Sequence, residues 1–403
     1  MEKSEFYAKA RRDVRGPLHG VVVVEITTTW AGPMAGCMLA DFGATVIKVE
    51  HPQGEVARRM LPMVPESTLS LAHETVNRNK QNLSLDLHLT EGRDILLRLC
   101  GNVDIVIENF KPGTLAGWGV GYGDVALVKP NIIYVSISGF GQFGPNSERA
   151  GYDPVAQNFS GWTSLNGEPD GGPMKAPTYL GDDLAGVHGA LAALAALHHR
   201  QRTGEGQHID VALVDGLLFQ NNGQLSAAAL GVPGERLGNQ FATAAPSNVY
   251  VCTDGRIYGG VLLDSHWQAL CSVLERPDLA AMRNVERIAQ RHLVDSLLAG
   301  WCATRTRAEV VATFIRLGLA VTPVNTFAEA AADEHVKVRD MLVNTRLNDG
   351  REVPLVGPVA KFSRTPIGVN NAAPAIGQDN EAILASLGYS PSERARLRSD
   401  GVI

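Results

Sequence analysis

Short apolar runs alternate with helical segments over the first 140 residues, and this alternation constrains the fold more than any other feature of the chain. Residues 21–26 and 45–52 are predicted strands, because each is a short apolar run of the kind found in strands buried on both faces. A helix over residues 31–44 separates them, with Pro33 at a favoured first-turn position. Strand, helix and strand together form a βαβ unit.

The same order continues along the chain. Residues 103–110 and 132–140 are predicted strands, residues 90–100 are a predicted amphipathic helix, and a further helix starts over residues 114–117. Residues 82–87 are a candidate short strand, and residues 208–220 are predicted to be a strand that runs into a helix. This repetition predicts an α/β fold with a Rossmann-like, mostly parallel open sheet. Ligands of such sheets bind at the carboxyl ends of the strands. The first strand is followed by TTTWAGPMAG rather than GxGxxG, which disfavours a nicotinamide enzyme.

The pattern changes beyond residue 225. The chain has 403 residues, more than one ordinary hydrophobic core holds, so at least two domains are expected. A loop is followed by short strands that meet at Asp254-Gly255, a hairpin signal, and then by helical segments over residues 265–318. We therefore predict a second, smaller domain over residues 225–325.

The net charge and the cysteine content indicate which classes of partner and which cellular compartment to expect. The net charge of −6 disfavours nucleic acid as a partner. No membrane span is expected from the apolar runs, and the polar N-terminus lacks the apolar segment of a signal peptide. The five cysteines contain no CxxC pair, which argues against a zinc site or a disulfide framework. We expect a cytoplasmic protein that binds neither membranes nor nucleic acid.

Two adjacent aspartates follow a glycine at the start of a long helical segment, as Gly181-Asp182-Asp183. One interpretation is structural: an aspartate caps the helix, and the second acid complements the helix dipole. The other is chemical: a helix N-terminus stabilises the ionised carboxylate, and a carboxylate can act as a nucleophile. Both interpretations can hold for the pair, and from these residues alone capping is the simpler one.

An ordered series of motifs resembles a known family. The series is GVVVVEITTTWAGPMAGCMLADFGATVIKVEHP, NRNKQNLSLDL, ENFKPG, SISGFGQFGP, GYDPVAQ, YLGDDLAG, RTGEGQHIDVALVD, LGN, TPVNT, VGPVAKFS and IGQDNEAILASLGYS. Together, over roughly residues 17–403, these motifs are similar to the class III coenzyme A-transferases, which include carnitine, formyl-CoA and succinyl-CoA transferases. No single motif decides the resemblance, but the ordered set is specific.

The resemblance implies an architecture. Residues 1–205 would form the first part of a large Rossmann-like domain, followed by a linker over 206–224 and a smaller α+β domain over 225–325. Residues 326–403 would form a return linker and the rest of the large domain. Two ring-shaped protomers would interlock, either as a homodimer or as a heterodimer with a related subunit.

The resemblance also implies a reaction. Members transfer CoA from an acyl-CoA donor, such as succinyl-CoA, to a carboxylic acid through an aspartyl anhydride and an aspartyl-CoA thioester. CoA and acyl-CoA are substrates, and neither a metal nor a permanently bound cofactor is implied. The family's catalytic aspartate follows the glycine of G-D-x-x-x-G, which assigns the nucleophile to Asp182, after Gly181.

Two alternatives stay open within this family. A second branch racemises 2-methylacyl-CoA and carries a histidine base where this chain has Tyr152, before Asp153. A tyrosine with a pKa of about 10 is a poor base for an α-proton, which favours a transferase. Tyr152 and Asp153 either form a turn with a buried aromatic ring, or Asp153 orients the nucleophile. The other alternative is a non-catalytic CoA-binding subunit, against which the intact GDDLAG argues.

The resemblance places CoA contacts on several loops. The candidates are Thr28, Thr29, Ala31, Arg78, Lys80, Asn109, Phe110, Lys111 and Trp118. The cations would neutralise phosphates, with ordinary surface cations as the alternative, and Trp118 would stack on adenine. Trp30 replaces a polar amide that in some transferases touches the intermediate. The sequence therefore does not identify the group that stabilises the oxyanion of the reaction. Trp30 either lines a pocket for the acyl group or only packs in the core.

Overall fold

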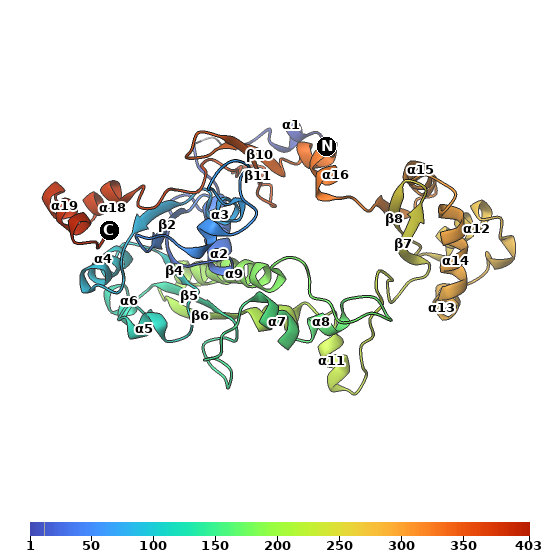
Figure 1. Cartoon of the computed structure of the whole chain (residues 1–403), viewed down its shortest axis with the longest axis horizontal. Coiled ribbons are helices and arrows are strands. Elements are labelled where there is room, and N and C mark those ends of the chain that lie inside the picture. The colour runs from blue at the N-terminus through green and yellow to red at the C-terminus, as the bar shows by residue number, and fades with distance from the viewer. Residues whose placement is uncertain (12) are drawn as a thin grey trace. The chain divides into compact units, whose positions relative to one another are not determined.

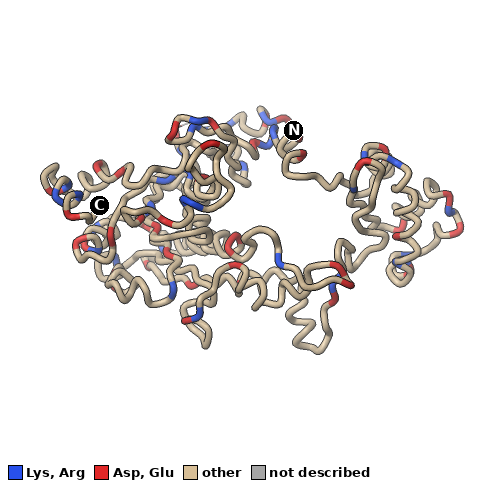
Figure 2. The backbone as a smooth tube through the Cα atoms, viewed as in Figure 1, with Lys and Arg blue, Asp and Glu red and all other residues tan. Residues whose placement is uncertain are grey.

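The computed structural model describes residues 1–11 and 13–403, which divide into two compact units (Figure 1). Unit 1 comprises Met1–Trp162, Lys175–Leu225 and Glu334–Ile403. Unit 2 comprises Thr163–Met174 and Ser226–Asp333. Acidic and basic residues are interspersed along the backbone of unit 1 (Figure 2).

A six-stranded parallel sheet forms the centre of unit 1, in the order β3-β2-β1-β4-β5-β6. The strands are β1 (Val22–Ile26), β2 (Thr45–Glu50), β3 (Gln81–Ser84), β4 (Ile105–Glu108), β5 (Ile133–Ser138) and β6 (Gln207–Ala212). The prediction of a parallel, Rossmann-like α/β sheet is confirmed. The strand order reverses between β1 and β4, where sheets of this kind open a crevice for ligands.

Alternate residues of each strand face two apolar layers, because successive strand side chains point to opposite faces. Val23 of β1 packs in the layer that contains α2 (Ala31–Asp41) and α9 (Leu180–Thr203). Val24 packs in the other layer, with α4 (Thr90–Cys100) and the C-terminal helices α18 (Asn380–Ser386) and α19 (Pro391–Ser399). The C-terminal segment thus completes the core that the N-terminal segment begins.

Shorter elements complete the described chain. They are α1 (Lys3–Phe6), η1 (Val56–Arg59), α3 (Leu71–Asn77), α5 (Thr114–Gly117), α6 (Tyr122–Val128), α7 (Asp153–Phe159), α8 (Trp162–Leu165), α10 (Leu213–Phe219), α11 (Gln224–Ala229), α16 (Phe327–Ala332) and α17 (Glu334–Val338). An antiparallel pair, β10 (Leu342–Arg346) and β11 (Glu352–Val356), belongs to unit 1.

The segment 206–224, predicted to be a linker, instead contributes β6 and α10 to unit 1. All six residues of β6 pair with β5. The strand lies at the edge of the sheet and is largely exposed at its start. Its polar residues therefore resemble a surface segment in the sequence, although its backbone is fully part of the sheet.

Unit 2 contains a three-stranded antiparallel sheet in the order β7-β8-β9, with β7 (Ser247–Cys252), β8 (Gly255–Gly260) and β9 (Ala320–Pro323). The hairpin between β7 and β8 closes at Asp254-Gly255, as predicted. Its helices are η2 (Pro277–Leu279), α12 (Asp264–Val273), α13 (Asn284–Ala289), α14 (Arg291–Cys302) and α15 (Arg307–Arg316). Trp267 and Phe314 are fully buried in its core.

The apolar character of helix α9 bears on the expectation that no membrane span is present. By length and composition it is apolar enough to cross a membrane. In unit 1 it is a core helix instead, because Ala185, Ala190 and Ala193 are buried in the layer shared with α2. Small residues let the two helices approach closely: a Cβ added to Gly186 would lie 2.9 Å from the carbonyl oxygen of Ala31.

Candidate active site

The loops that follow β1 and β4 are joined by one side chain at the reversal of strand order. Asn109 Nδ2 donates to the carbonyl oxygen of Thr28 at 2.8 Å, and Asn109 Oδ1 accepts from the Thr28 N–H at 2.9 Å. This pair of hydrogen bonds fixes the two loops that border the crevice. The side-chain amide of Asn109 therefore holds the backbone of Thr28 in place.

Thr29 has a strained backbone that the surrounding structure holds in place. Its φ of 68° lies in the left-handed region, which is unfavourable for a β-branched residue. Glu55 Oε2 accepts the Thr29 N–H at 2.8 Å, and Lys48 Nζ lies 2.8 Å from Glu55 Oε1. The buried ion pair thus stabilises the turn that leads into Trp30 and the start of α2.

Asp183 is engaged by Trp30. The indole Nε1 donates to Asp183 Oδ1 at 2.6 Å, and the indole ring lies 5.3 Å from the ring of Tyr179. Burial raises the pKa of Asp183, and the hydrogen bond from Trp30 opposes that shift. Trp30 therefore joins the β1 loop to the first turn of α9 and is more than core packing.

Asp182 is different, because no other residue in the described part of the chain donates a hydrogen bond to its carboxyl group or pairs with it. It lies in the first turn of α9, partly buried. Burial and the nearby charges of Asp153 and Asp183 raise the pKa of Asp182 to about 7. This corrects the expectation that the helix N-terminus keeps the carboxylate ionised: burial outweighs the dipole.

The capping interpretation is also wrong. Helix α9 begins at Leu180, so its N-cap is Tyr179, and no side chain caps the helix. Asp182 and Asp183 lie inside the first turn, where an acid complements the helix dipole without satisfying a backbone amide.

Asp153 holds the backbone next to Asp182. Its Oδ1 accepts the Gly181 N–H at 2.7 Å, and its Oδ2 accepts from Gln157 Nε2 at 2.7 Å. A Cβ added to Gly181 would lie 3.2 Å from Asp153 Oδ1, so a glycine suits this close approach. Asp153 is 2% exposed, whereas Tyr152 is 65% exposed, so the interpretation of Tyr152 as a buried aromatic ring is wrong.

Four rings gather where β2, β3 and β4 end. Ring centroids lie 6.4 Å apart for His51 and His88, 4.9 Å for His88 and Trp118, and 5.6 Å for Phe110 and Trp118. All four rings are at least partly exposed. The sequence analysis identified Phe110 and Trp118 but missed both histidines. His51 lies at the end of the predicted strand 45–52, and His88 directly follows the candidate strand 82–87. These positions at strand ends were the signal that would have found them.

Two predicted phosphate-binding cations are buried in internal ion pairs, which corrects that prediction. Arg78 makes a two-pronged ion pair with Asp41, with Nη2 2.6 Å from Oδ2 and Nε 3.2 Å from Oδ1. Lys80 Nζ lies 2.7 Å from Glu25 Oε1 and is buried. Both side chains attach the segment after α3 to the α2 layer. Lys111 is exposed, and no described residue pairs with it.

Comparisons with known proteins identify the family of the chain. Residues 18–380 match the family described as CoA-transferase family III. The chain is 36% identical over 384 residues to succinate–glutarate CoA-transferase of Agrobacterium fabrum, covering 92% of this chain and 96% of that protein. It is 34% identical over 394 residues to succinyl-CoA–D-citramalate CoA-transferase of Chloroflexus aurantiacus, covering 96% and 98%.

Solved structures are similar as well. The crystal structure of a CAIB/BAIF family protein from Brucella suis has a TM-score of 0.83 and 34% identity, covering 93% of this chain and all of that chain. The alpha and beta subunits of succinyl-CoA–L-malate CoA-transferase of Chloroflexus aurantiacus are each 33% identical, over 96% of this chain and 87% and 98% of those subunits. The similarity extends over nearly the whole chain.

Proposed function

The chain belongs to CoA-transferase family III, and on that basis we propose that it transfers coenzyme A from succinyl-CoA or a similar donor to a dicarboxylic acid, with Asp182 as nucleophile. The observation that carries the proposal is the carboxyl group of Asp182, which is partly buried, has no hydrogen-bond or ion-pair partner among the described residues, and has a pKa of about 7. The names of the relatives, which pair succinate or succinyl-CoA with glutarate or D-citramalate, support the substrate class.

The first step follows from the electrostatics of this carboxyl group. At neutral pH a large fraction of Asp182 is ionised, and no described residue stabilises the anion by a hydrogen bond, so it is a ready nucleophile. It attacks the donor thioester carbonyl and releases CoA thiolate, forming an acyl-aspartyl anhydride. Asp153 keeps the backbone of Gly181 in place during this attack.

The remaining steps exchange acids on the same aspartate. The CoA thiolate attacks the aspartyl carbonyl, which releases the donor acid and leaves an aspartyl-CoA thioester. The acceptor carboxylate attacks that thioester and expels the thiolate, forming a new anhydride. The thiolate then takes the acyl group and frees Asp182. The cycle conserves the thioester only where water is excluded.

The start of α2 supplies the best candidates for oxyanion stabilisation. The first N–H groups of a helix have no intrahelical partner and carry partial positive charge. The N–H groups of Thr28 and Thr29 are already bonded to Asn109 and Glu55. We therefore assign oxyanion stabilisation to the N–H groups of Ala31 and Gly32, because Pro33 has no N–H and that of Met34 is bonded to the Trp30 carbonyl oxygen. Ala31 lies against α9.

The four-ring cluster of His51, His88, Phe110 and Trp118 is the proposed adenine site, because partly exposed rings at the carboxyl edge present faces for stacking. The exposed Arg59 and Lys111 are the proposed phosphate ligands in place of Arg78 and Lys80.

The assembly and compartment are proposed on the same basis. We propose a dimer of interlocked protomers, either of two copies or with a related subunit, since the relatives include paired alpha and beta subunits. All five cysteines are free and buried, which suits a cytoplasmic protein. Residues 226–333 lie in the small unit, and residues 334–403 return to the large one.

The test separates transfer from racemisation. The purified protein is given succinyl-CoA and a panel of dicarboxylic acids, and CoA transfer and α-proton exchange with deuterated solvent are followed separately. Transfer without exchange supports the proposal, because Tyr152 is no suitable base and Asp153 is bonded to Gly181 and Gln157. Exchange without transfer identifies a racemase, and neither activity in the chain alone indicates a partner-dependent subunit.

A further inference from the structure

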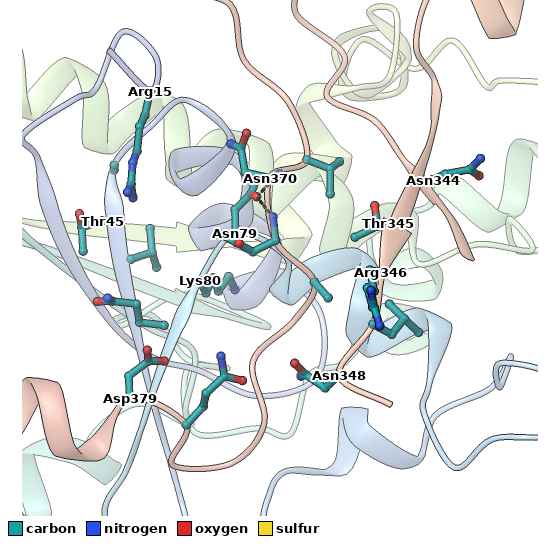
Figure 3. Close-up of a pocket in the computed structure, with 18 residues that line it drawn as sticks. Arg15, Thr45, Asn79, Lys80, Asn344, Thr345, Arg346, Asn348, Asn370 and Asp379 are labelled. Carbon is teal, nitrogen blue, oxygen red and sulfur yellow. Dashed lines mark hydrogen bonds between the residues drawn. The ribbon is translucent and has the colours of Figure 1, made fainter. Parts of the chain in front are cut away.

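A polar cavity of about 790 Å³ opens at the amino ends of β2 and β3 (Figure 3). Thr45 and Gln81, the first residues of these two strands, line it. Because the sheet is parallel, this edge lies opposite the carboxyl ends that carry the proposed transfer site. The volume is within the range of cavities that bind small molecules.

One wall of the cavity is fixed by Asn79. Its Nδ2 donates to Asp41 Oδ1 and to the Gly368 carbonyl oxygen, each at 2.8 Å. Its Oδ1 accepts the N–H groups of Asn370 at 2.7 Å and Asn371 at 3.0 Å. The amide thus attaches a C-terminal segment to the start of β3. A wall held this firmly needs little ordering when a ligand binds.

A second wall is held in the same way. Asn348 Nδ2 donates to the Ala373 carbonyl oxygen at 2.7 Å, and Asp379 Oδ2 accepts the Asn82 N–H at 2.8 Å. The cavity is therefore built by side chains that connect distant parts of the sequence. The NRNK segment, which supplies Asn79 and Lys80, belongs to this cavity rather than to the transfer site.

The charges that face the cavity are unbalanced. Arg15 and Arg346 are exposed, and neither guanidinium group has a hydrogen bond or ion pair with another described residue. The backbone of Arg346 pairs with that of Glu352 between β10 and β11. Lys80 is neutralised by Glu25, and Asp379 is the one acidic side chain among the described lining residues. In Figure 3, Arg15 and Arg346 lie on opposite sides of Asn79. The cavity thus carries two unpaired guanidinium groups against one carboxylate.

We propose that this cavity binds a small organic polyanion, a molecule with two separated carboxylate or phosphate groups, at a site distinct from that of CoA transfer. Arg15 and Arg346 bind its two anionic ends, since guanidinium groups pair with carboxylate and phosphate through charge-assisted hydrogen bonds. The side-chain amide of Asn344 faces the same space and binds its uncharged polar groups.

Calorimetry on the full chain tests this, with citrate as the carboxylate probe and pyrophosphate as the phosphate probe. Saturating coenzyme A occupies the transfer site, and the ionic strength is held constant. The single variants Arg15→Gln and Arg346→Gln are compared with Arg202→Gln, which changes an exposed arginine at the far end of α9. The Asp182→Asn variant controls for binding in the transfer site.

We expect saturable binding of at least one probe, and the probe that binds identifies the anionic group. Each cavity variant should weaken it roughly 10-fold or more, the effect of losing one charge-assisted interaction. The Arg202→Gln and Asp182→Asn variants should bind as the unaltered chain does. Absence of saturable binding for both probes, or equal affinity in the cavity variants, would overturn the proposal. Thermal melts check that each variant is folded.

Discussion

Buried charges serve opposite purposes in two regions of unit 1. Beneath α2, Glu25, Lys48 and Lys80 are fully buried, and each is within 3.5 Å of an opposite charge. At the start of α9, Asp182 is also withdrawn from water, but it has no opposite charge beside it and two like charges near it. The presence of an oppositely charged partner, rather than burial, therefore distinguishes a structural charged group from a reactive one.

The largest effect should come from Asp182 itself. Asp182→Asn removes the nucleophile, so kcat for CoA transfer should fall at least about 1,000-fold. The matched variant is Asp183→Asn in the same turn, whose amide oxygen still accepts from Trp30. It should retain turnover within about 10-fold. Equal losses in the two variants would remove the distinction between the neighbouring carboxyl groups.

The paired region should respond in stability rather than in chemistry. Lys80→Met leaves Glu25 with the longer contact to Lys48 at 3.5 Å and the hydrogen bond from the Thr27 hydroxyl at 3.1 Å. We expect the free energy of unfolding to fall by about 3–5 kcal/mol, measured by urea denaturation. Lys111→Met, at an exposed cation, should change it by less than about 0.5 kcal/mol. Similar stabilities would show that the buried ion pair is not needed for folding.

The pH dependence of the reaction should report the unpaired carboxyl group. With a pKa of about 7, the ionised fraction of Asp182 rises roughly tenfold between pH 6 and pH 8, and kcat/KM should rise with it. Asp153→Asn removes one of the charges that raise this pKa, so the midpoint should move to lower pH. A flat profile over this range would contradict the electrostatic description of the site.

The smallest expected effect is a gain in stability. The pKa of Asp182 is higher in the folded state than in the unfolded state, so the folded state binds more protons. The contribution of Asp182 to the free energy of unfolding therefore falls as pH rises from about 4 to about 7. Asp182→Asn should therefore be more stable than the unaltered chain at pH 8, by at most about 4 kcal/mol at about 1.4 kcal/mol per pKa unit, and similar to it at pH 4. Thermal unfolding at both values measures this. A loss of stability at pH 8 would contradict the raised pKa of Asp182 in the folded state.

Regular patterns made most of the fold predictable. The runs that became β1, β2, β4 and β5 are apolar because both faces of each strand are covered, and a single sequence displays that directly. The edge strand β6 lacks this signature. A strand running into a helix was predicted over residues 208–220, as β6 and α10 confirm, but the segment was assigned to a linker rather than to the sheet. Docking of the C-terminal helices onto the N-terminal strands depends on contacts nearly 300 residues apart, and no local pattern encodes these.

The site was less predictable than the fold. The residue proposed as nucleophile came from the resemblance, because a Gly-Asp-Asp before a helix also fits a cap. Arg78 and Lys80 were predicted to bind phosphates, with exposed surface cations as the alternative. Nothing nearby in sequence reveals their ion-pair partners Asp41 and Glu25. The clustering of His51 with His88 depends on which strands are neighbours in the sheet.

The most direct test of the central claim is chemical capture of the intermediate. The protein is incubated with succinyl-CoA, treated with hydroxylamine, digested and analysed by mass spectrometry. We predict a hydroxamate on Asp182, equally present in Asp183→Asn and absent from Asp182→Asn. A protein that turns over while Asp182 stays unmodified, or that carries the hydroxamate on another residue, would contradict the account.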